Sequence, residues 1–435
     1  MKHAAPASEA GPITVIWQQV VTYILITLVG FNLRSVLLGV PPVLPLIQHD
    51  LGLSYTATGF LTALPVLVLA AGAWPSGLLA ERIGARLSVS IGLALLATGT
   101  LLRAFRLTTP SLFFFTLILS IGITLSQTAI PVLIRRWYPK QIGLASALFS
   151  DGLILGEAVA AGITVLIMVR FLGSDAWAST FVFWGIPAVV LFALWLWLAP
   201  PAPAKVSRPQ FTRPAKSLDV NSPIQRKRVN ALYLGILVGG GSLIYFGMNA
   251  WIASYNQALH QSYLTPVALL SLNAAQLPVS LAVTLVAQQI VGRRWPFIAA
   301  GIISALAIIG WIFTPAELQP LWAALLGGSG ALVFTLGIAL PPLLALPQEV
   351  GRLTGITLSL TYGVAFVGPF IGGALWDLFN LPAMAFVPVV IASVMLIVLG
   401  ALLPSRASFG IPGELSPTDK GENKQGAFTS TPPTT

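Results

Sequence analysis

One arginine, Arg34, stands inside a long apolar stretch that runs from about residue 16 to residue 47. A charge at the centre of a lipid bilayer costs ~2.5–3.5 kcal/mol even on a lenient scale, so such a residue faces a bundle interior or a watery cavity. Its planar guanidinium presents a fork of donors that suits carboxylate-like groups. We therefore expect Arg34 either to bind a small planar anion in a central cavity or to pair with a buried acid.

Two acids, Asp151 and Glu157, fall on one apolar segment over 142–170. Six positions on an α-helix place them ~120° apart and ~9 Å apart along the axis, so they cannot face the same partner. Glu157 lies deeper and is the candidate for carrying a coupling proton, because the proton affinity of a buried carboxylate changes when an arginine approaches. A static pair with Arg34 is the alternative, and the two roles are not exclusive. Asp151 lies nearer the expected cytoplasmic end.

Polar and aromatic residues recur at mid-depth in other apolar segments. They either line the cavity opposite Arg34 or bond helix to helix, which stabilises by ~0.6–2 kcal/mol each. We rank Asn249 and Tyr362 highest, because their segments are expected to flank the cavity. The set comprises Gln127, Tyr245, Asn249, Trp251, Asn273, Gln276 and Tyr362.

Composition predicts the fold class. Of the 435 residues 56% are hydrophobic and only 8% are charged, which exceeds what a soluble domain needs. The sequence predicts an all-α polytopic membrane protein with twelve transmembrane helices. Cysteine is absent, which excludes disulfides and thiol chemistry. The twelve segments are 16–47, 55–80, 87–105, 111–134, 142–170, 178–199, 231–258, 266–290, 296–313, 321–346, 354–376 and 382–404.

The positions of Lys and Arg predict the orientation. With the N-terminus inside, 19 of the 23 basic residues fall in cytoplasmic loops, the linker or the tails, three fall outside, and Arg34 is left within the membrane. This bias predicts that both termini are cytoplasmic. It also explains the net charge of +10 without a nucleic acid partner. Arg103 and Arg106, at the outer end of the third segment, are expected to be snorkelling anchors, with electrostatic attraction of anions as the alternative.

The two halves of the sequence resemble each other, which indicates an internal repeat. Residues 62–66 resemble 275–279, and 131–133 resemble 341–343, with corresponding segments running in the same direction. We expect a cytoplasmic N-terminal tail at 1–15, a six-helix bundle at 16–199, a cytoplasmic linker at 200–230, a second six-helix bundle at 231–404, and a disordered cytoplasmic tail at 405–435. Gly152 and Gly156 should form a close-packing surface, as should Gly368 and Gly372.

The loop over 77–86 reads Gly-Leu-Leu-Ala-Glu-Arg-Ile-Gly-Ala-Arg, which resembles the loop signature of the major facilitator superfamily, with Glu81 in place of Asp and Ala85 departing. The stretches 32–34, 50–54, 64–67, 131–139 with its continuation over 143–150, and 363–377 resemble its cyanate-permease and 2-nitroimidazole-exporter branch. This resemblance implies the major facilitator fold, a bacterial cytoplasmic membrane location and a monomer. An inner gate is expected to involve Glu81, Arg82, Arg86, Asp151, Arg135 and Arg136.

These features predict a secondary transporter that moves a small anionic solute, cyanate-like or similar, by alternating access and with proton coupling. Arg34 would hold the substrate and Glu157 would be the coupling acid. The alternative is an exporter of neutral, nitroimidazole-like toxic compounds, in which Trp251, Tyr245 and Tyr362 matter more. An enzyme is not expected, because the two intramembrane acids are separated and no histidine accompanies them. We expect no cofactor and no metal, with partners limited to the small-molecule substrate, H⁺ and the lipid bilayer.

Overall fold

The computed structural model describes residues 12–105, 108–139, 141–167, 177–201, 231–344 and 350–403. Within those ranges every regular element is helical, and twelve spans are long and apolar enough to cross a membrane. The predicted all-α, twelve-span fold is therefore confirmed. Almost all of the predicted linker, the C-terminal tail, and Arg106, Lys140 and Arg170 lie outside the described residues.

The N-terminal half contributes six spans, of which the first is divided by a proline-rich turn. Pro41 and Pro42 open this turn, because proline cannot continue the hydrogen bonding of the preceding helix. The elements are α1 (Pro12–Leu38), η1 (Pro41–Val43), α2 (Leu44–Leu51), α3 (Tyr55–Ile83), α4 (Ala85–Leu102), α5 (Thr109–Trp137), α6 (Ile142–Ile167) and α7 (Trp177–Leu198).

The C-terminal half contributes the other six spans. Its elements are α8 (Ala231–Ala258), η3 (Ser262–Leu264), α9 (Thr265–Ala274), α10 (Gln276–Ile290), α11 (Trp295–Phe313), η4 (Ala316–Leu318), α12 (Gln319–Leu344), α13 (Val350–Phe379), η5 (Pro382–Phe386) and α14 (Val387–Leu402).

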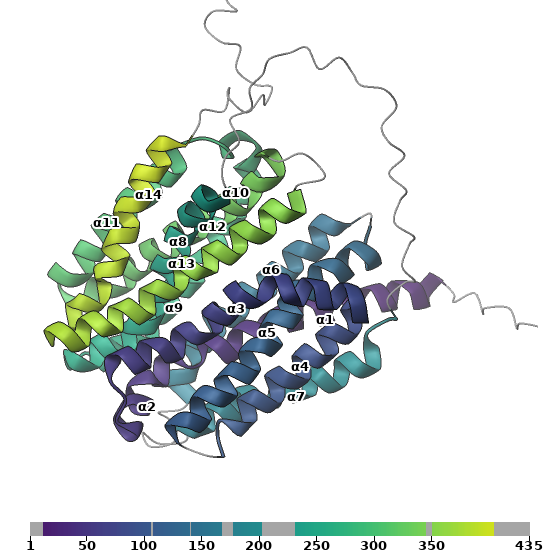
Figure 1. The fold of residues 1–435 in the computed structure, drawn as a ribbon, viewed down its shortest axis with the longest axis horizontal. Coiled ribbons are helices and arrows are strands. Elements are labelled where there is room, and N and C mark those ends of the chain that lie inside the picture. The colour runs from purple at the N-terminus through teal and green to yellow at the C-terminus, as the bar shows by residue number, and fades with distance from the viewer. Residues whose placement is uncertain are drawn as a thin grey trace, which may run out of the picture.

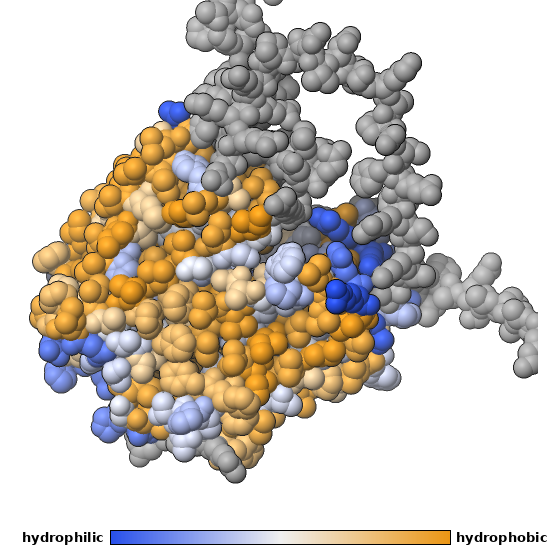
Figure 2. All heavy atoms as spheres, viewed as in Figure 1, coloured by the Kyte–Doolittle hydropathy of each residue, from blue (hydrophilic) through white to orange (hydrophobic). Residues whose placement is uncertain are grey.

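The two halves form two bundles that meet along α3 and α13 (Figure 1). The purple and blue N-terminal bundle and the green and yellow C-terminal bundle lie on opposite sides of this seam. Apolar residues cover most of the visible face between the two ends of the helices, and hydrophilic residues gather at those ends (Figure 2). This distribution matches a protein whose flanks contact lipid rather than water.

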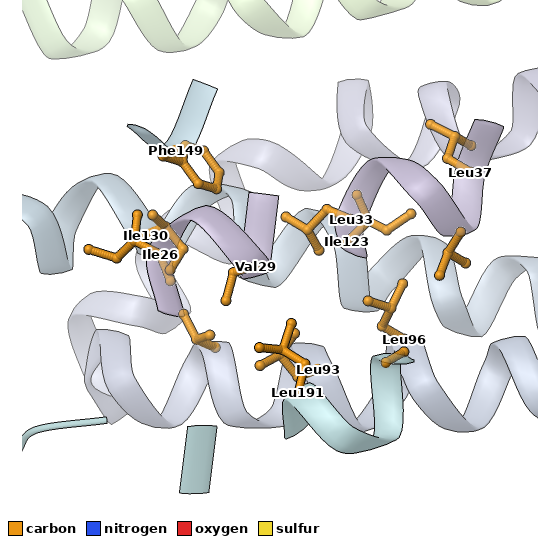
Figure 3. Close-up of a cluster of buried hydrophobic side chains, with 14 of the residues drawn as sticks. Ile26, Val29, Leu33, Leu37, Leu93, Leu96, Ile123, Ile130, Phe149 and Leu191 are labelled. Carbon is orange, nitrogen blue, oxygen red and sulfur yellow. The ribbon is translucent and has the colours of Figure 1, made fainter. Parts of the chain in front are cut away.

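α1 packs into the N-terminal bundle through one apolar stripe. Ile26, Val29, Leu33 and Leu37 follow the spacing of one helix face and are buried against α4, α5 and α7 (Figure 3). Arg34 follows Leu33 by one residue, so it projects ~100° away from the stripe. The stripe therefore turns Arg34 away from the bundle core and toward α6 and α8.

Glycines bring the equivalent helix pairs of the two halves close together. A Cβ atom at Gly152 or Gly156 on α6 would lie 2.2 Å from the carbonyl oxygens of Thr27 and Phe31 on α1. In the other half, a Cβ at Gly368 on α13 would lie 3.1 Å from the carbonyl oxygen of Leu243 on α8. The predicted close-packing surfaces are confirmed, and the α1–α6 and α8–α13 pairs correspond in the repeat.

The eighth span is broken in its middle, although the sequence predicts one continuous helix over 266–290. α9 ends at Ala274 and α10 begins at Gln276, with Ala275 between them. Pro278 explains the break, because it has no N–H to donate to the carbonyl four residues earlier. Asn273 and Gln276 consequently flank an irregular segment of backbone inside the protein.

Candidate functional site

Arg34 and Glu157 form a buried ion pair between α1 and α6. Arg34 Nε lies 3.3 Å from Glu157 Oε1, and the side chains are 8% and 6% exposed. Gly156 allows this approach, because it lets the backbones of the two helices touch one residue away. The guanidinium carbon also lies 5.8 Å from the ring centroid of Phe246 on α8, which places the positive charge between the two halves.

The guanidinium retains unused hydrogen-bond donors. Arg34 Nε and Nη1 are buried, and neither has a hydrogen-bond partner among the described residues. The contact with Glu157 is therefore an ion pair that lacks the alignment of a hydrogen bond. An unsatisfied buried donor on a charged group is costly, and a planar acceptor that fits the guanidinium fork would satisfy it.

The other oxygen of Glu157 reaches the C-terminal half. Gln276 Nε2 donates to Glu157 Oε2 at 3.1 Å, and the same amide nitrogen lies 3.4 Å from the carbonyl oxygen of Asn273. Gln276 is the first residue of α10, so the break in the eighth span positions it. Irregular backbone inside a membrane protein is tolerated where it is buried or lines a cavity, and it often marks a binding site.

A chain of buried polar side chains continues from Gln276 into α8. Tyr245 donates its hydroxyl hydrogen to Asn273 Oδ1 at 2.7 Å, and Asn273 Nδ2 donates to Asn249 Oδ1 at 2.9 Å. Asn249 Nδ2 in turn donates to the carbonyl oxygen of Tyr245 at 3.0 Å. These residues form a neutral wall next to the Arg34–Glu157 pair.

A second contact between the halves joins Gln127 on α5 to Tyr362 on α13. Gln127 Nε2 donates to the Tyr362 hydroxyl at 3.0 Å, and Gln127 Oε1 is buried without a hydrogen-bond partner in the described part of the chain. We refer below to Arg34, Glu157, Gln127, Tyr245, Asn249, Asn273, Gln276 and Tyr362 as the central polar cluster.

Trp251 lies apart from the central polar cluster. Its indole Nε1 donates to the carbonyl oxygen of Pro369 at 3.2 Å, and its ring contacts the rings of Tyr55 and Trp376. The structure thus places Trp251 in the α3–α13 seam rather than beside Arg34.

The seam carries a contact that the sequence reasoning missed. Asp377 on α13 accepts hydrogen bonds from the backbone N–H groups of Tyr55 and Thr56 at 2.9 and 2.7 Å, and from the Thr56 hydroxyl at 2.6 Å. Tyr55 also stacks on Trp376, with ring centroids 4.0 Å apart. We call Tyr55, Thr56, Trp376 and Asp377 the clasp.

A carboxylate at the N-terminus of α3 is stabilised by the unpaired N–H groups and the helix dipole. The signal available in the sequence was an acid at the end of an apolar segment.

Most residues predicted to form an inner gate lie at the ends of α3, α4 and α5 away from the clasp, whereas Asp151 lies inside α6. Arg86 Nη2 donates to the carbonyl oxygen of Leu196 at 3.3 Å, while Glu81, Arg82 and Arg135 are exposed. Among the described residues, the ion pairs are Arg34–Glu157 and His49–Asp50. Asp151 is therefore not paired with Arg135 or Arg136 in this conformation.

Residues 22–288 match the family model of the Major Facilitator Superfamily. The chain belongs to this superfamily. Over 355 residues it is 28% identical to the cyanate transport protein CynX of Escherichia coli (strain K12), an alignment that covers 81% of this chain and 89% of that protein. It is 26% identical to the 2-nitroimidazole transporter of the same organism, over 86% of this chain and 93% of that protein. The resemblance to this branch of the superfamily is confirmed.

Solved superfamily structures share the fold. The D-xylose–proton symporter matches with a TM-score of 0.70 at 14% identity, covering 89% of this chain and 97% of that one. A bacterial homologue of the lysosomal transporter Spinster, in an inward-facing and unoccupied conformation, matches with a TM-score of 0.68 at 14% identity, covering 92% and 97%. The chain is thus a multi-pass membrane transporter of the Major Facilitator Superfamily.

Proposed function

We propose that this protein carries a small anion across the bacterial cytoplasmic membrane by alternating access, coupled to protons. The observation that carries the proposal is the buried guanidinium of Arg34, whose Nε faces the Glu157 carboxylate and whose Nη1 has no hydrogen-bond partner among the described residues. The similarity to a cyanate transport protein supports a linear or planar anion of a few atoms. Arg34 holds the anion, and Asn249, Asn273, Tyr245, Gln127 and Tyr362 complete the site.

Charge balance provides the coupling. Leaving a buried charge without a partner costs about 3–5 kcal/mol, so Arg34 needs one negative partner at every stage. In the unloaded protein Glu157 is that partner. When an anion binds the guanidinium of Arg34, it displaces the Glu157 carboxylate. The carboxylate is then a buried charge without a partner, and a proton neutralises it. The site therefore alternates between an Arg34–Glu157 pair and an Arg34–anion pair with protonated Glu157.

The two halves provide the conformational change. Glu157 from one half meets Gln276 from the other, so rocking of residues 16–199 against 231–404 changes the access of both to water. With both termini in the cytoplasm, the clasp closes the outer end in this conformation. Glu81, Arg82, Arg86, Asp151, Arg135 and Arg136 lie toward the inner end and form the inner gate in the opposite conformation.

The similarity to a 2-nitroimidazole transporter supports a second candidate, the export of a neutral aromatic compound. In that case Arg34 and Glu157 remain paired throughout, and Tyr245 and Tyr362 make the principal contacts. Trp251 is 0% exposed within the seam, so it reaches such a compound only when the clasp opens.

Uptake of labelled cyanate into proteoliposomes, with and without an imposed pH gradient, tests the proposal. Arg34→Lys keeps the charge and loses the fork, so we expect a drop in kcat/KM of roughly 10-fold or more. The double variant Arg34→Gln/Glu157→Gln removes both charges without stranding either, and we expect it to fold and to transport no anion. Arg293→Lys, at an exposed loop position, is the matched control and should transport normally. Normal anion transport by the folded double variant would contradict the proposal.

A further inference from the structure

Arg103 is a second buried cation, and the central polar cluster does not account for it. It is the residue that follows α4, and its side chain is 3% exposed. A snorkelling arginine would expose its guanidinium, so the expectation of a snorkelling anchor is wrong for Arg103. The guanidinium carbon instead lies 4.2 Å from the ring centroid of Phe181 on α7.

No acid compensates this charge within the part of the chain that the structure describes. The two ion pairs found there do not include Arg103, and its Nε is buried without a hydrogen-bond partner. A cation–π contact contributes about 2 kcal/mol when desolvated, which is less than the cost of an unpaired buried charge. A bound anion would supply the partner that this arginine lacks.

Arg103 lines a cavity between the N-terminal half and α8. Thr62 on α3, Thr116 on α5 and Asn249 on α8 contribute polar groups to its wall, and the rest of the wall is apolar. Its volume is about 30 Å³. One water molecule needs roughly 10–15 Å³ on this measure, so the cavity admits a solute of a few atoms and excludes larger organic anions.

The cavity adjoins the Arg34 site but is separate from it. Phe246 lines the cavity, and its ring also lies 5.8 Å from the Arg34 guanidinium carbon. Asn249 likewise lines the cavity and bonds to Asn273 in the central polar cluster. Arg34 itself is not part of the cavity wall. The Phe246 ring and the Asn249 amide thus lie between two positions at which an anion could contact an arginine, one at Arg34 and one at Arg103.

We propose that Arg103 binds a small monovalent anion in this cavity. We call this second anion-binding site, which lies beside the Arg34 site, the second station. The proposal rests on the proposed function, because the anion is of the class that Arg34 carries. The second station lies on the clasp side of Arg34, where α1 and α4 end and α3 and α5 begin. It raises the local concentration of anions at one end of the path.

Equilibrium dialysis of the purified protein against labelled thiocyanate, a linear and unreactive three-atom anion, counts the stations. We expect about two anions per wild-type protein, one at Arg103 and one that displaces Glu157 from Arg34. Arg103→Met and Arg34→Gln/Glu157→Gln should each bind about one, and their combination none. Arg293→Met is the matched control at an exposed position and should bind as wild type.

The melting temperature of a variant shows whether it has lost only the second station or has failed to fold. Replacing an unpaired buried charge by an apolar side chain removes a desolvation cost, so Arg103→Met should melt at or above the wild-type temperature. Arg103→Lys keeps the charge and should bind at the second station about tenfold more weakly. Two bound anions in Arg103→Met, or no binding to the wild type, would overturn the proposal. A single anion that survives in Arg34→Gln/Glu157→Gln and disappears in Arg103→Met would support this station and contradict the Arg34 site.

Discussion

Arg34 and Glu157 are each costly to bury alone, and their pairing removes that cost only while both charges are present. Arg34 Nε and Glu157 Oε1 are 3.3 Å apart without hydrogen-bond alignment, and under the proposed function an anion replaces Glu157 as the partner of Arg34. A well-aligned bidentate pair would resist such an exchange. Under the proposed function, the lack of alignment favours this exchange of partners during the transport cycle.

We predict that Glu157→Gln uncouples transport from the pH gradient. The glutamine cannot take up the proton that compensates the incoming anion, so accumulation driven by a pH gradient should be lost. Exchange of labelled for unlabelled cyanate should persist, with a lower KM, because Arg34 then has no competing carboxylate. Glu317→Gln changes an exposed acid and serves as the control in the same liposome assay. Full pH-driven accumulation by Glu157→Gln would exclude Glu157 as the coupling acid.

At the residue scale the sequence singles out Arg34 and Glu157 and offers their pairing as one alternative, and the structure shows that pair. Arg34 is recognisable because no other basic residue falls in the middle of an apolar segment. Its pairing with Glu157 depends on the rotation of α6 against α1, which packing decides. Arg103 shows the limit, because a residue at a helix end looks the same in sequence whether it snorkels or is buried.

At the scale of elements, glycines and one helix break position the site. Gly152 and Gly156 set the distance between α1 and α6, and the break at Ala275 places Gln276 and Asn273 beside Glu157. Small-x-x-x-small spacing is visible in a sequence, so the glycine contacts could be predicted. The break was not predicted, because proline is also tolerated inside membrane helices, as Pro65 and Pro75 are in α3.

We predict that Gly156→Ala lowers the melting temperature of the purified protein and reduces transport. The added Cβ would lie 2.2 Å from a backbone oxygen of α1, which cannot move as a side chain can. Overpacking of this kind costs about 1–3 kcal/mol and would also shift Glu157 against Arg34. Gly143→Ala, in the same helix with no atom within 4 Å, is the matched control. Equal melting temperatures for the two variants would contradict the packing argument.

At the scale of the molecule, two six-span halves meet at a seam that is closed at the clasp end. Gly59 and Gly373 bring α3 and α13 into backbone contact there, and Asp377 ties the two helices together. The division into two six-span halves could be predicted from the segment count, and the cytoplasmic location of both termini stays a prediction from the loop charges. Which end is closed could not, because the sequence is the same in every conformation of the cycle.

We predict that Asp377→Asn shifts the population toward a conformation that is open at the clasp. The amide keeps the shape but loses the charge that the N-terminus of α3 favours, which is worth roughly 0.3–2 kcal/mol. The chain has no cysteine, so spin labels can be placed at His49→Cys and Phe379→Cys without further changes. Distances measured between the labels should lengthen or broaden in Asp377→Asn. An unchanged distribution would show that the clasp does not hold this end closed.

The central claim is that an anion and a proton exchange places around Arg34 and Glu157. Calorimetry of cyanate binding at one pH, in two buffers of different ionisation enthalpy, measures it directly. We predict uptake of about one proton per protein when cyanate binds to the wild type, because only the Arg34 site is coupled to Glu157, and none by Glu157→Gln. Anion binding whose heat is the same in both buffers would contradict the account.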